Sequence, residues 1–187
     1  MRSTIAIDVA APPGLVFSLA RDTERWERLL PHYARSRATE RRADGSVVVD
    51  FVARRPLIGI LGLGLPVTWR ARTWNEPATL RLRFAHVAGA TKGMDVTWRI
   101  DGVGDGSRIS IDHAFRPRFA PFAAFVDRVF TRPIAGRTLA TFKALAEALV
   151  EDADRARTAP GMLATSSGAS TAKPGQSETP PPTIPRI

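Results

Sequence analysis

The chain has 187 residues, a length typical of one globular domain, and 44% of them are apolar. It contains no cysteine, which excludes disulfide bonds, thiol catalysis and thiolate metal sites. The formal net charge is +9, but 24 of the 27 basic residues are arginine. A GC-rich genome also produces that skew, so we expect nucleic acid not to be the main partner. The first residues show no signal-peptide pattern, and we expect a cytoplasmic protein.

The first 116 residues predict one strand, two short helices and six further strands. Residues 3–9 alternate between apolar and polar side chains, as a strand does. The segment "APPGLVFSLA" has proline where a helix can begin, and "DTERWERLLP" has an Asp/Thr start and a terminating proline. Turn sequences such as "RADG", "NEPA" and "GVGDG" then separate predicted strands at 33–39, 46–53, 67–74, 79–87, 92–101 and 107–116.

The C-terminal part divides near residue 152. From Pro121 to Glu151 apolar residues recur at helical spacing, which predicts one long helix with a kink at Pro133 and Gly136. Residues 152–187 hold six of the fifteen prolines and no aromatic residue, so we expect a disordered Pro/Ser/Thr-rich tail. The order β-α-α-β6-α predicts an α+β fold, in which a curved antiparallel seven-stranded sheet wraps around the long helix.

Four segments carry a family resemblance: the strand and two helices at the start, "FAHVAGATKGMDVTWRID", "RISIDHAF" and "PIAGRTLATFKALAEAL". Over residues 3–150 the chain resembles the polyketide cyclase/dehydrase branch of the START-like (SRPBCC) superfamily. The resemblance implies a helix-grip fold, which we place at residues 1–151, with a cavity between sheet and helix. Its motifs are Gly-x-x-x-Gly-Met-x-x-x-Trp and a histidine on a strand, and they include no invariant catalytic signature.

The stretch "RRPLIGILGLGLPVTWRAR", residues 54–72, has fourteen uncharged central residues with three glycines. A membrane-spanning helix needs about 20 apolar residues, and a phosphate-binding loop needs glycines that lead into a helix. We therefore expect an apolar, flexible connection between the third and fourth strands. The resemblance implies that it gates the cavity, where Leu61 and Leu63 would contact the ligand. Packing on the long helix and shallow insertion into a membrane surface are the alternatives.

Alternation along the strands predicts which side chains face the cavity. Registers that keep the apolar faces together pair Phe84 with Val96 and Ile100 with Ile109. If "NEPA" is a four-residue turn, Trp69 lies opposite Phe84 and also faces inward. The expected ligand-binding side chains on the strands are Trp69, Phe84, Met94, Trp98, Ile111 and Phe115.

Two histidines, His86 and His113, share the inward phase and are the candidates for ligand contact or proton transfer. Their Cα atoms are expected to lie roughly 12 Å apart, too far to share a metal ion. Neither has an evident Ser and Asp companion, and a buried imidazole bonded to a neighbouring group is the alternative for both. We expect no metal and no cofactor. Tyr33 shares its phase with Arg35 and Arg37, so we expect it to point outward.

Five arginines gather on the outer face of the sheet if Trp69 faces inward: Arg70, Arg72, Arg81, Arg83 and Arg99. The resemblance implies substrates tethered to acidic acyl carrier proteins, and such a carrier or an anionic membrane could dock on this arginine face. A solvated face balanced by Asp95, Asp101 and Asp112 is the favoured interpretation. A shift of one residue in the fourth strand would instead turn Arg70 and Arg72 inward, where the aromatase/cyclases it resembles carry an arginine.

Three classes of function remain. In the first, the domain binds a polyketide-like or lipid-like hydrophobic molecule and, as an enzyme, catalyses aldol cyclisation with dehydration, with His113 or His86 moving a proton. In the second it is a non-catalytic carrier or chaperone for a lipid or quinone. In the third it is an interaction protein that uses the arginine face.

Overall fold

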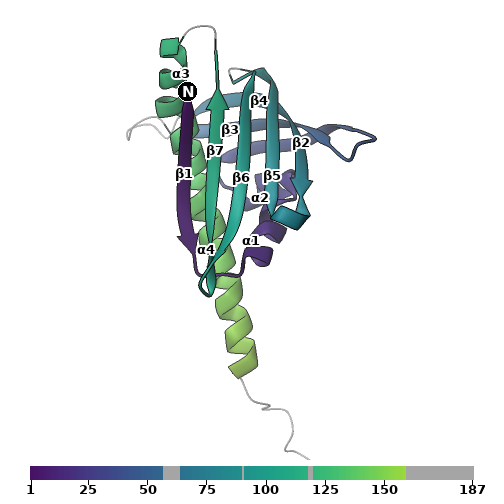
Figure 1. The fold of residues 1–187 in the computed structure, drawn as a ribbon, viewed down its shortest axis with the longest axis vertical. Helices are drawn as coiled ribbons and strands as arrows, with labels where there is room; N and C mark the ends of the chain where they lie inside the picture. Colours follow the sequence, from purple (N-terminus) through teal and green to yellow (C-terminus); the bar gives the residue numbers. More distant parts are fainter. Residues whose placement is uncertain (57–63, 90, 118–119, 159–187) are drawn as a thin grey trace, which may run out of the picture.

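The computed structural model describes residues 1–56, 64–89, 91–117 and 120–158. Its strands form one antiparallel sheet with the order β1-β7-β6-β5-β4-β3-β2, which curves around the C-terminal helix (Figure 1). This confirms the predicted α+β, helix-grip arrangement. The strands are β1 (Arg2–Val9), β2 (Tyr33–Arg41), β3 (Val47–Pro56), β4 (Gly64–Glu76), β5 (Arg81–Gly89), β6 (Met94–Val103) and β7 (Gly106–Phe115).

The helices lie on the concave side and at the two ends of the sheet (Figure 1). Two short helices, with a 3₁₀ turn between them, follow β1, and a helical region from residue 120 onward follows β7. None of the described helices is long and apolar enough to span a bilayer. The elements are α1 (Pro13–Ala20), the 3₁₀ turn η1 (Thr23–Arg25), α2 (Trp26–Leu29), the 3₁₀ turn η2 (Pro77–Thr79), α3 (Ala120–Val126), the π-helical turn η3 (Asp127–Thr131) and α4 (Arg132–Thr158).

The registers of β5, β6 and β7 follow the apolar pattern. Phe84 pairs with Val96 and Ile100 pairs with Ile109, which confirms both predicted pairs. Because these strands present one apolar face to the core, a slip by one residue would bury their polar side chains.

The register between β4 and β5 differs from the prediction. Trp69 lies opposite Gly89, and Thr73 is the partner of Phe84. Strand β4 continues through Glu76, and the chain turns at residues 77–80 instead of within "NEPA". The partner of Phe84 moves by four positions along β4, whereas the partner of Trp69 moves by five along β5, because a register shift lies between Arg70 and Ala71. Trp69 still packs against the core, so its inward direction is as predicted although its predicted partner was wrong.

The C-terminal helix is interrupted before the predicted kink. The π-helical turn η3 directly precedes α4, and α4 then passes through Gly136 as regular α-helix. Pro133 has no N–H to donate to the carbonyl four residues earlier, and its ring crowds that carbonyl. The preceding turn therefore widens, which is how a π-bulge accommodates such a conflict.

Helix α4 also extends past the predicted boundary of the domain. Residues 152–158, which composition placed in the tail, are helical and exposed. Ion pairs three residues apart join Arg155 to Asp152 and Arg157 to Asp154, and such pairs stabilise an exposed helix without apolar burial. Residues 159–187 lie outside the described residues, so the disordered tail stays a prediction there.

Trp26 of α2 stands at the centre of an aromatic core. Only 2% of it is exposed, and its Nε1–H donates a hydrogen bond of 2.9 Å to the carbonyl of Ala20. Ring centroids lie 5.3–5.9 Å from it on the sheet, on α4 and at the start of β2, in Tyr33, Phe51, Phe84, Trp98 and Phe142. The short helix α2 thus inserts one large side chain between the sheet and α4.

Candidate ligand-binding site

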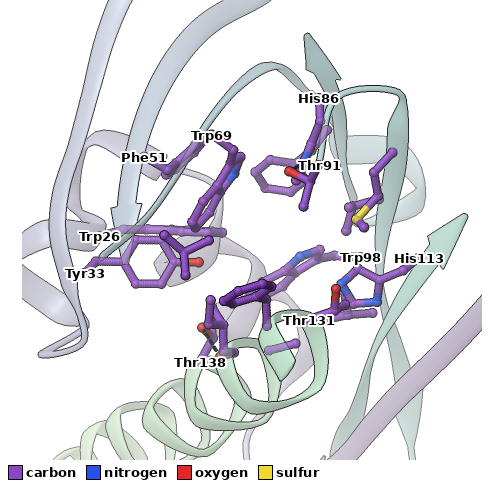
Figure 2. Close-up of a pocket in the computed structure, with 18 residues that line it drawn as sticks. Trp26, Tyr33, Phe51, Trp69, His86, Thr91, Trp98, His113, Thr131 and Thr138 are labelled. Atoms are coloured by element: carbon purple, nitrogen blue, oxygen red, sulfur yellow. Dashed lines mark hydrogen bonds between the residues drawn. The ribbon is translucent and has the colours of Figure 1, made fainter. Parts of the chain in front are cut away.

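A cavity of about 80 Å³ lies between the inner face of the sheet and the segment from η3 into α4 (Figure 2). Strands β2 to β7 form one side, and Trp26 of α2 closes one end. Seven of the 18 lining residues are Trp, Tyr or Phe, namely Trp26, Tyr33, Phe51, Trp69, Phe84, Trp98 and Phe130.

Three stacked rings form a flat part of this wall. Phe51 and Trp69 are nearly parallel, with centroids 5.2 Å apart and an interplanar angle of 16°. His86 continues the stack on the other face of Trp69, at 6.0 Å and 15°. The rings come from the adjacent strands β3, β4 and β5, so strand pairing sets their spacing.

The cavity reaches solvent along one edge. Most lining side chains are buried, whereas Trp69, His86, Phe130 and Ile134 are partly exposed. These four residues define the mouth of the cavity among the described residues. The predicted gate, with Leu61 and Leu63, falls on residues 57–63, which lie outside the described residues; the neighbouring residues 64–69 belong to β4.

His86 and His113 both line the cavity, and both are neutral near physiological pH (Figure 2). Burial lowers the pKa of His86 to about 3, and the nearby His113 lowers it further. Burial also lowers the pKa of His113 to about 4, although Asp127 and Asp112 oppose the shift. His86 Nδ1 lies 2.6 Å from the hydroxyl oxygen of Thr91. His113 Nδ1 is enclosed by protein and has no partner at hydrogen-bond geometry.

Behind His113 the structure assembles a carboxylate site that is not evident in the sequence. Ser3 is the partner of His113 across the β1–β7 pair. The Ser3 hydroxyl donates a hydrogen bond of 2.7 Å to Asp127 Oδ1, and Arg132 Nε donates one of 2.8 Å to Asp127 Oδ2. Ser3 is 124 residues from Asp127 in the chain, and it reaches this site because β1 pairs with β7.

Tyr33 faces the cavity, and the prediction that it points outward was wrong. It is 7% exposed, and burial raises its pKa above the usual range, so the phenol stays protonated. The pairing of β2 with β3 is irregular between Tyr33 and Arg35. A bulge at that point breaks the alternation that placed Tyr33 on the same side as Arg35 and Arg37.

A second polar group, missed in the sequence, adjoins Tyr33. His32 is buried, and its Nε2 lies 2.9 Å from Thr138 Oγ1. The Thr138 hydroxyl donates to the carbonyl of Ile134 at 2.8 Å, so it accepts a hydrogen bond from His32 Nε2–H. Burial, with a smaller effect of Arg137, lowers the pKa of His32 to about 4. In the sequence, only the position of His32 directly before Tyr33 indicated that it lies near the cavity.

The predicted ligand-binding residues divide between the cavity and the adjacent core. Phe115 lies outside the lining and packs near Phe122, with centroids 6.4 Å apart. No group of three or more metal-ligating side chains occurs among the residues that the structure describes. The residues that do line the cavity are Trp69, Phe84, Met94, Trp98 and Ile111.

The arginine face lies on the opposite side of the sheet and carries its own counter-charges. Arg70 and Arg72 point away from the cavity, so the inward alternative is wrong. Of the expected counter-charges, Asp112 forms an ion pair with this face, but Asp95 and Asp101 form none among the described residues. The pairs are Arg70–Asp50, Arg72–Asp44, Arg83–Glu76 and Arg99–Asp112.

The comparisons with known proteins agree with this architecture. Residues 1–151 match the family described as polyketide cyclase/dehydrase and lipid transport. The chain belongs to this family. No curated protein sequence matches it significantly. Membership of the polyketide cyclase/dehydrase and lipid transport family, together with the largely apolar cavity, identifies a domain that binds a hydrophobic small molecule.

Solved structures show the same fold at low sequence identity. The aromatase/cyclase Zhui from a Streptomyces species has a TM-score of 0.64 and 19% identity, covering 86% of this chain and 98% of its own. A protein from Thermus thermophilus has a TM-score of 0.60 and 19% identity, with coverages of 81% and 99%. A START superfamily protein from Mycobacterium smegmatis has a TM-score of 0.55 and 17% identity, with coverages of 81% and 98%. At these identities the likeness shows the fold.

Proposed function

We propose that this protein binds an uncharged, oxygen-bearing hydrophobic molecule of polyketide type and catalyses its cyclisation or dehydration. The observation that carries the proposal is the composition of the cavity wall. Aromatic and aliphatic side chains form most of it, and its polar groups are the neutral side chains of Tyr33, His86, Thr91, His113, Thr131 and Thr138.

The charge of the lining favours a neutral ligand. None of the described lining residues is Asp, Glu, Lys or Arg. A carboxylate placed there would lose its hydration without meeting a cation, which costs far more than burial of a hydroxyl or carbonyl group. Hydroxyl and imidazole groups can instead donate to, or accept from, the oxygens of a phenol, quinone or β-ketone.

The size of the cavity limits how a ligand is accommodated. Its volume of about 80 Å³ is below the roughly 150 Å³ that holds a benzene molecule in an engineered protein cavity. A ring therefore enters only if side chains at the mouth move outward. Phe130 and Ile134 are partly exposed, so their displacement costs less burial than that of the enclosed rings.

The chemistry that suits this wall is proton transfer by a neutral imidazole. In the dehydration of an aldol product, His113 takes a proton from the carbon next to a ketone while the carbon–carbon double bond forms. The carbon–oxygen bond breaks, and the departing oxygen takes the proton back and leaves as water. Positioning of the polyketide in the cavity supplies much of the acceleration.

We expect His113→Ala to abolish turnover, because the variant lacks the base, while its affinity for the ligand stays nearly unchanged.

Matched pairs of ligands test the proposal. Three of the four tryptophans, Trp26, Trp69 and Trp98, line the cavity, so its occupation should change the intrinsic fluorescence of the full chain. We expect 2-naphthol to bind at least about tenfold more tightly than 2-naphthoate at pH 7.5, because only the carboxylate must be buried unpaired. Trp74→Phe, which leaves the lining intact, should give the same affinities.

The outcomes separate the parts of the proposal. If 2-naphthoate or dodecanoate binds as tightly as 2-naphthol, the neutral-ligand class is wrong, although the cavity still binds hydrophobic molecules. If 2-naphthol, 1,4-naphthoquinone and dodecanol all leave the fluorescence unchanged, the cavity does not bind hydrophobic molecules and the proposal fails.

A lipid carrier is the second candidate, and the surface of α3 favours it. This helix has no charged residue, and Phe122 and Phe125 are 38% and 53% exposed. Exposed aromatic side chains on a short helix of a protein with net charge +9 suit contact with an anionic bilayer.

Vesicle binding tests the carrier function. We expect the full chain to sediment with phosphatidylglycerol vesicles, and Phe122→Ser with Phe125→Ser to weaken this binding several-fold, because apolar burial in the bilayer is lost. Val103→Ser, which alters an exposed apolar residue on β6, is the matched control. Equal binding by both variants would exclude α3 as the contact.

The arginine face gives less support to a carrier-protein partner. Four of its five arginines are already paired with carboxylates, and an acidic partner would have to displace them. An interaction protein that uses the arginine face is therefore the weakest of the three candidate functions. A salt-dependent interaction that Arg81, Arg83 and Arg99 substitutions weaken would be its signature.

A further inference from the structure

We propose that Asp127 is a positioning residue for His113: together with Ser3 it holds the imidazole as the Nδ1–H tautomer and leaves Nε2 as the base that faces the cavity. Neither the wall of the cavity nor the family resemblance assigns a role to Asp127. The use of His113 in proton transfer rests on the proposed function, but its tautomer does not.

The first step is the set of polar groups that Ser3 and Asp127 place behind the His113 ring. Ser3 lies directly across the β1–β7 pair from His113, and its only hydroxyl proton is donated to Asp127 at 2.7 Å. The Ser3 hydroxyl proton is therefore not available to the ring, and the carboxylate of Asp127 that takes it is negative. A lone pair on Nδ1 would meet negative charge, whereas a proton on Nδ1 is attracted to it.

The second step is the enclosure of Nδ1. This atom is buried and has no partner at full hydrogen-bond geometry. The Ser3 backbone is nonetheless close enough to raise the pKa of His113, as do Asp127 and Asp112, against the lowering by burial and by Arg132. These surroundings favour a proton on the enclosed Nδ1 over a lone pair.

The third step is the direction of Nε2. The imidazole projects from β7 toward the cavity beside Thr131 (Figure 2). Nε2 is the nitrogen at the far end of the ring, so it is the one that a ligand can reach. When it accepts a proton, the carboxylate of Asp127 stabilises the imidazolium from the opposite side.

The two histidines are not equivalent in this respect. His86 Nδ1 contacts the hydroxyl of Thr91 at 2.6 Å, and no carboxylate contributes to its pKa. His113 alone of this pair has a negative group behind it, which selects it as the base. The π-helical turn makes this possible, since the same turn brings Thr131 to the cavity and Asp127 to Ser3.

The tautomers can be measured directly in the full chain, without a ligand. It contains three histidines, so long-range ¹H–¹⁵N correlation spectra at pH 7.5 are simple and can be assigned with single His→Gln variants. We expect His113 to carry its proton on Nδ1 in the native protein. Asp127→Asn should shift it toward the Nε2–H form, with more than half the population changed, while His32 and His86 keep their tautomers.

Two further variants make the test specific. Ser3→Ala keeps the carboxylate of Asp127 but removes the hydrogen bond that ties it to β1, and this variant should reduce the Nδ1–H population of His113 as well. Asp112→Asn removes a carboxylate that also raises the pKa of His113 but that Arg99 and Thr4 hold on the outer face, so it should change the tautomer much less than Asp127→Asn does.

Either of two results overturns the proposal. One is the Nε2–H tautomer at His113 in the native protein. The other is an Nδ1–H population that both Asp127→Asn and Ser3→Ala leave unchanged. If only one of these variants folds, an unchanged population in that variant has the same meaning. Failure of 2-naphthol, 1,4-naphthoquinone and dodecanol alike to bind the native protein would instead refute the proposed function, and the two failures are therefore distinguishable.

Discussion

Trp26→Ala is expected to lower the free energy of unfolding by about 3–5 kcal/mol, the range for removal of a buried large aromatic side chain. Trp26 is almost fully enclosed, touches five aromatic rings and holds α2 through its bond to the Ala20 carbonyl. No neighbouring element can move in to fill the space, because those rings are themselves held by the sheet and by α4. Urea unfolding followed by circular dichroism measures the loss.

Trp74→Ala is the matched control for this prediction. Trp74 lies on β4 outside the aromatic core, is only partly buried and contacts the Arg72 guanidinium at 5.6 Å from the ring centroid. Its removal should cost about 1 kcal/mol. Equal losses for the two variants would show that Trp26 does not organise the core.

Acidification is expected to destabilise the protein steeply between pH 6.5 and about pH 4. In the unfolded chain each histidine takes up a proton near pH 6.5, whereas burial lowers the pKa of His32 and His113 to about 4 and that of His86 to about 3 in the fold. The unfolded state therefore binds more protons within this window, so stability is full above pH 6.5 and declines as the pH falls. Each histidine contributes at most about 1.4 kcal/mol per pH unit.

Urea midpoints at pH 7.5, 6.5, 6.0 and 5.5 measure this dependence above the range in which carboxylates titrate. Single His32→Gln, His86→Gln and His113→Gln variants should each flatten the slope by about a third, since each removes one of three similar proton-uptake sites. A slope that all three variants leave unchanged would mean that the histidines are charged or solvated in the folded protein.

Local patterns were sufficient for most of the sheet. The apolar alternation in β5, β6 and β7 predicted the pairs Phe84–Val96 and Ile100–Ile109 and the inward direction of His113, because only one register buries those faces together. The helical spacing after residue 121 likewise predicted the C-terminal helix, but neither the π-helical turn nor the extension to Thr158.

The errors occurred where backbone geometry departs from regular alternation. An irregularity beside Tyr33 turned that side chain into the cavity, and a longer β4 placed Trp69 opposite Gly89. Neither feature has a strong signal in sequence, since one extra residue in a strand or turn changes the composition very little.

What the sequence by itself determined is the α+β fold, the apolar inner face of the sheet and the absence of thiol chemistry, since these depend on residue type and period. Tertiary structure decided which polar groups meet. Ser3 lies far from His113 and Asp127 in the chain, and only the β1–β7 pairing and the widened turn before Pro133 bring the three together. A contact of this kind depends on the path of the backbone in three dimensions, which no local periodicity encodes.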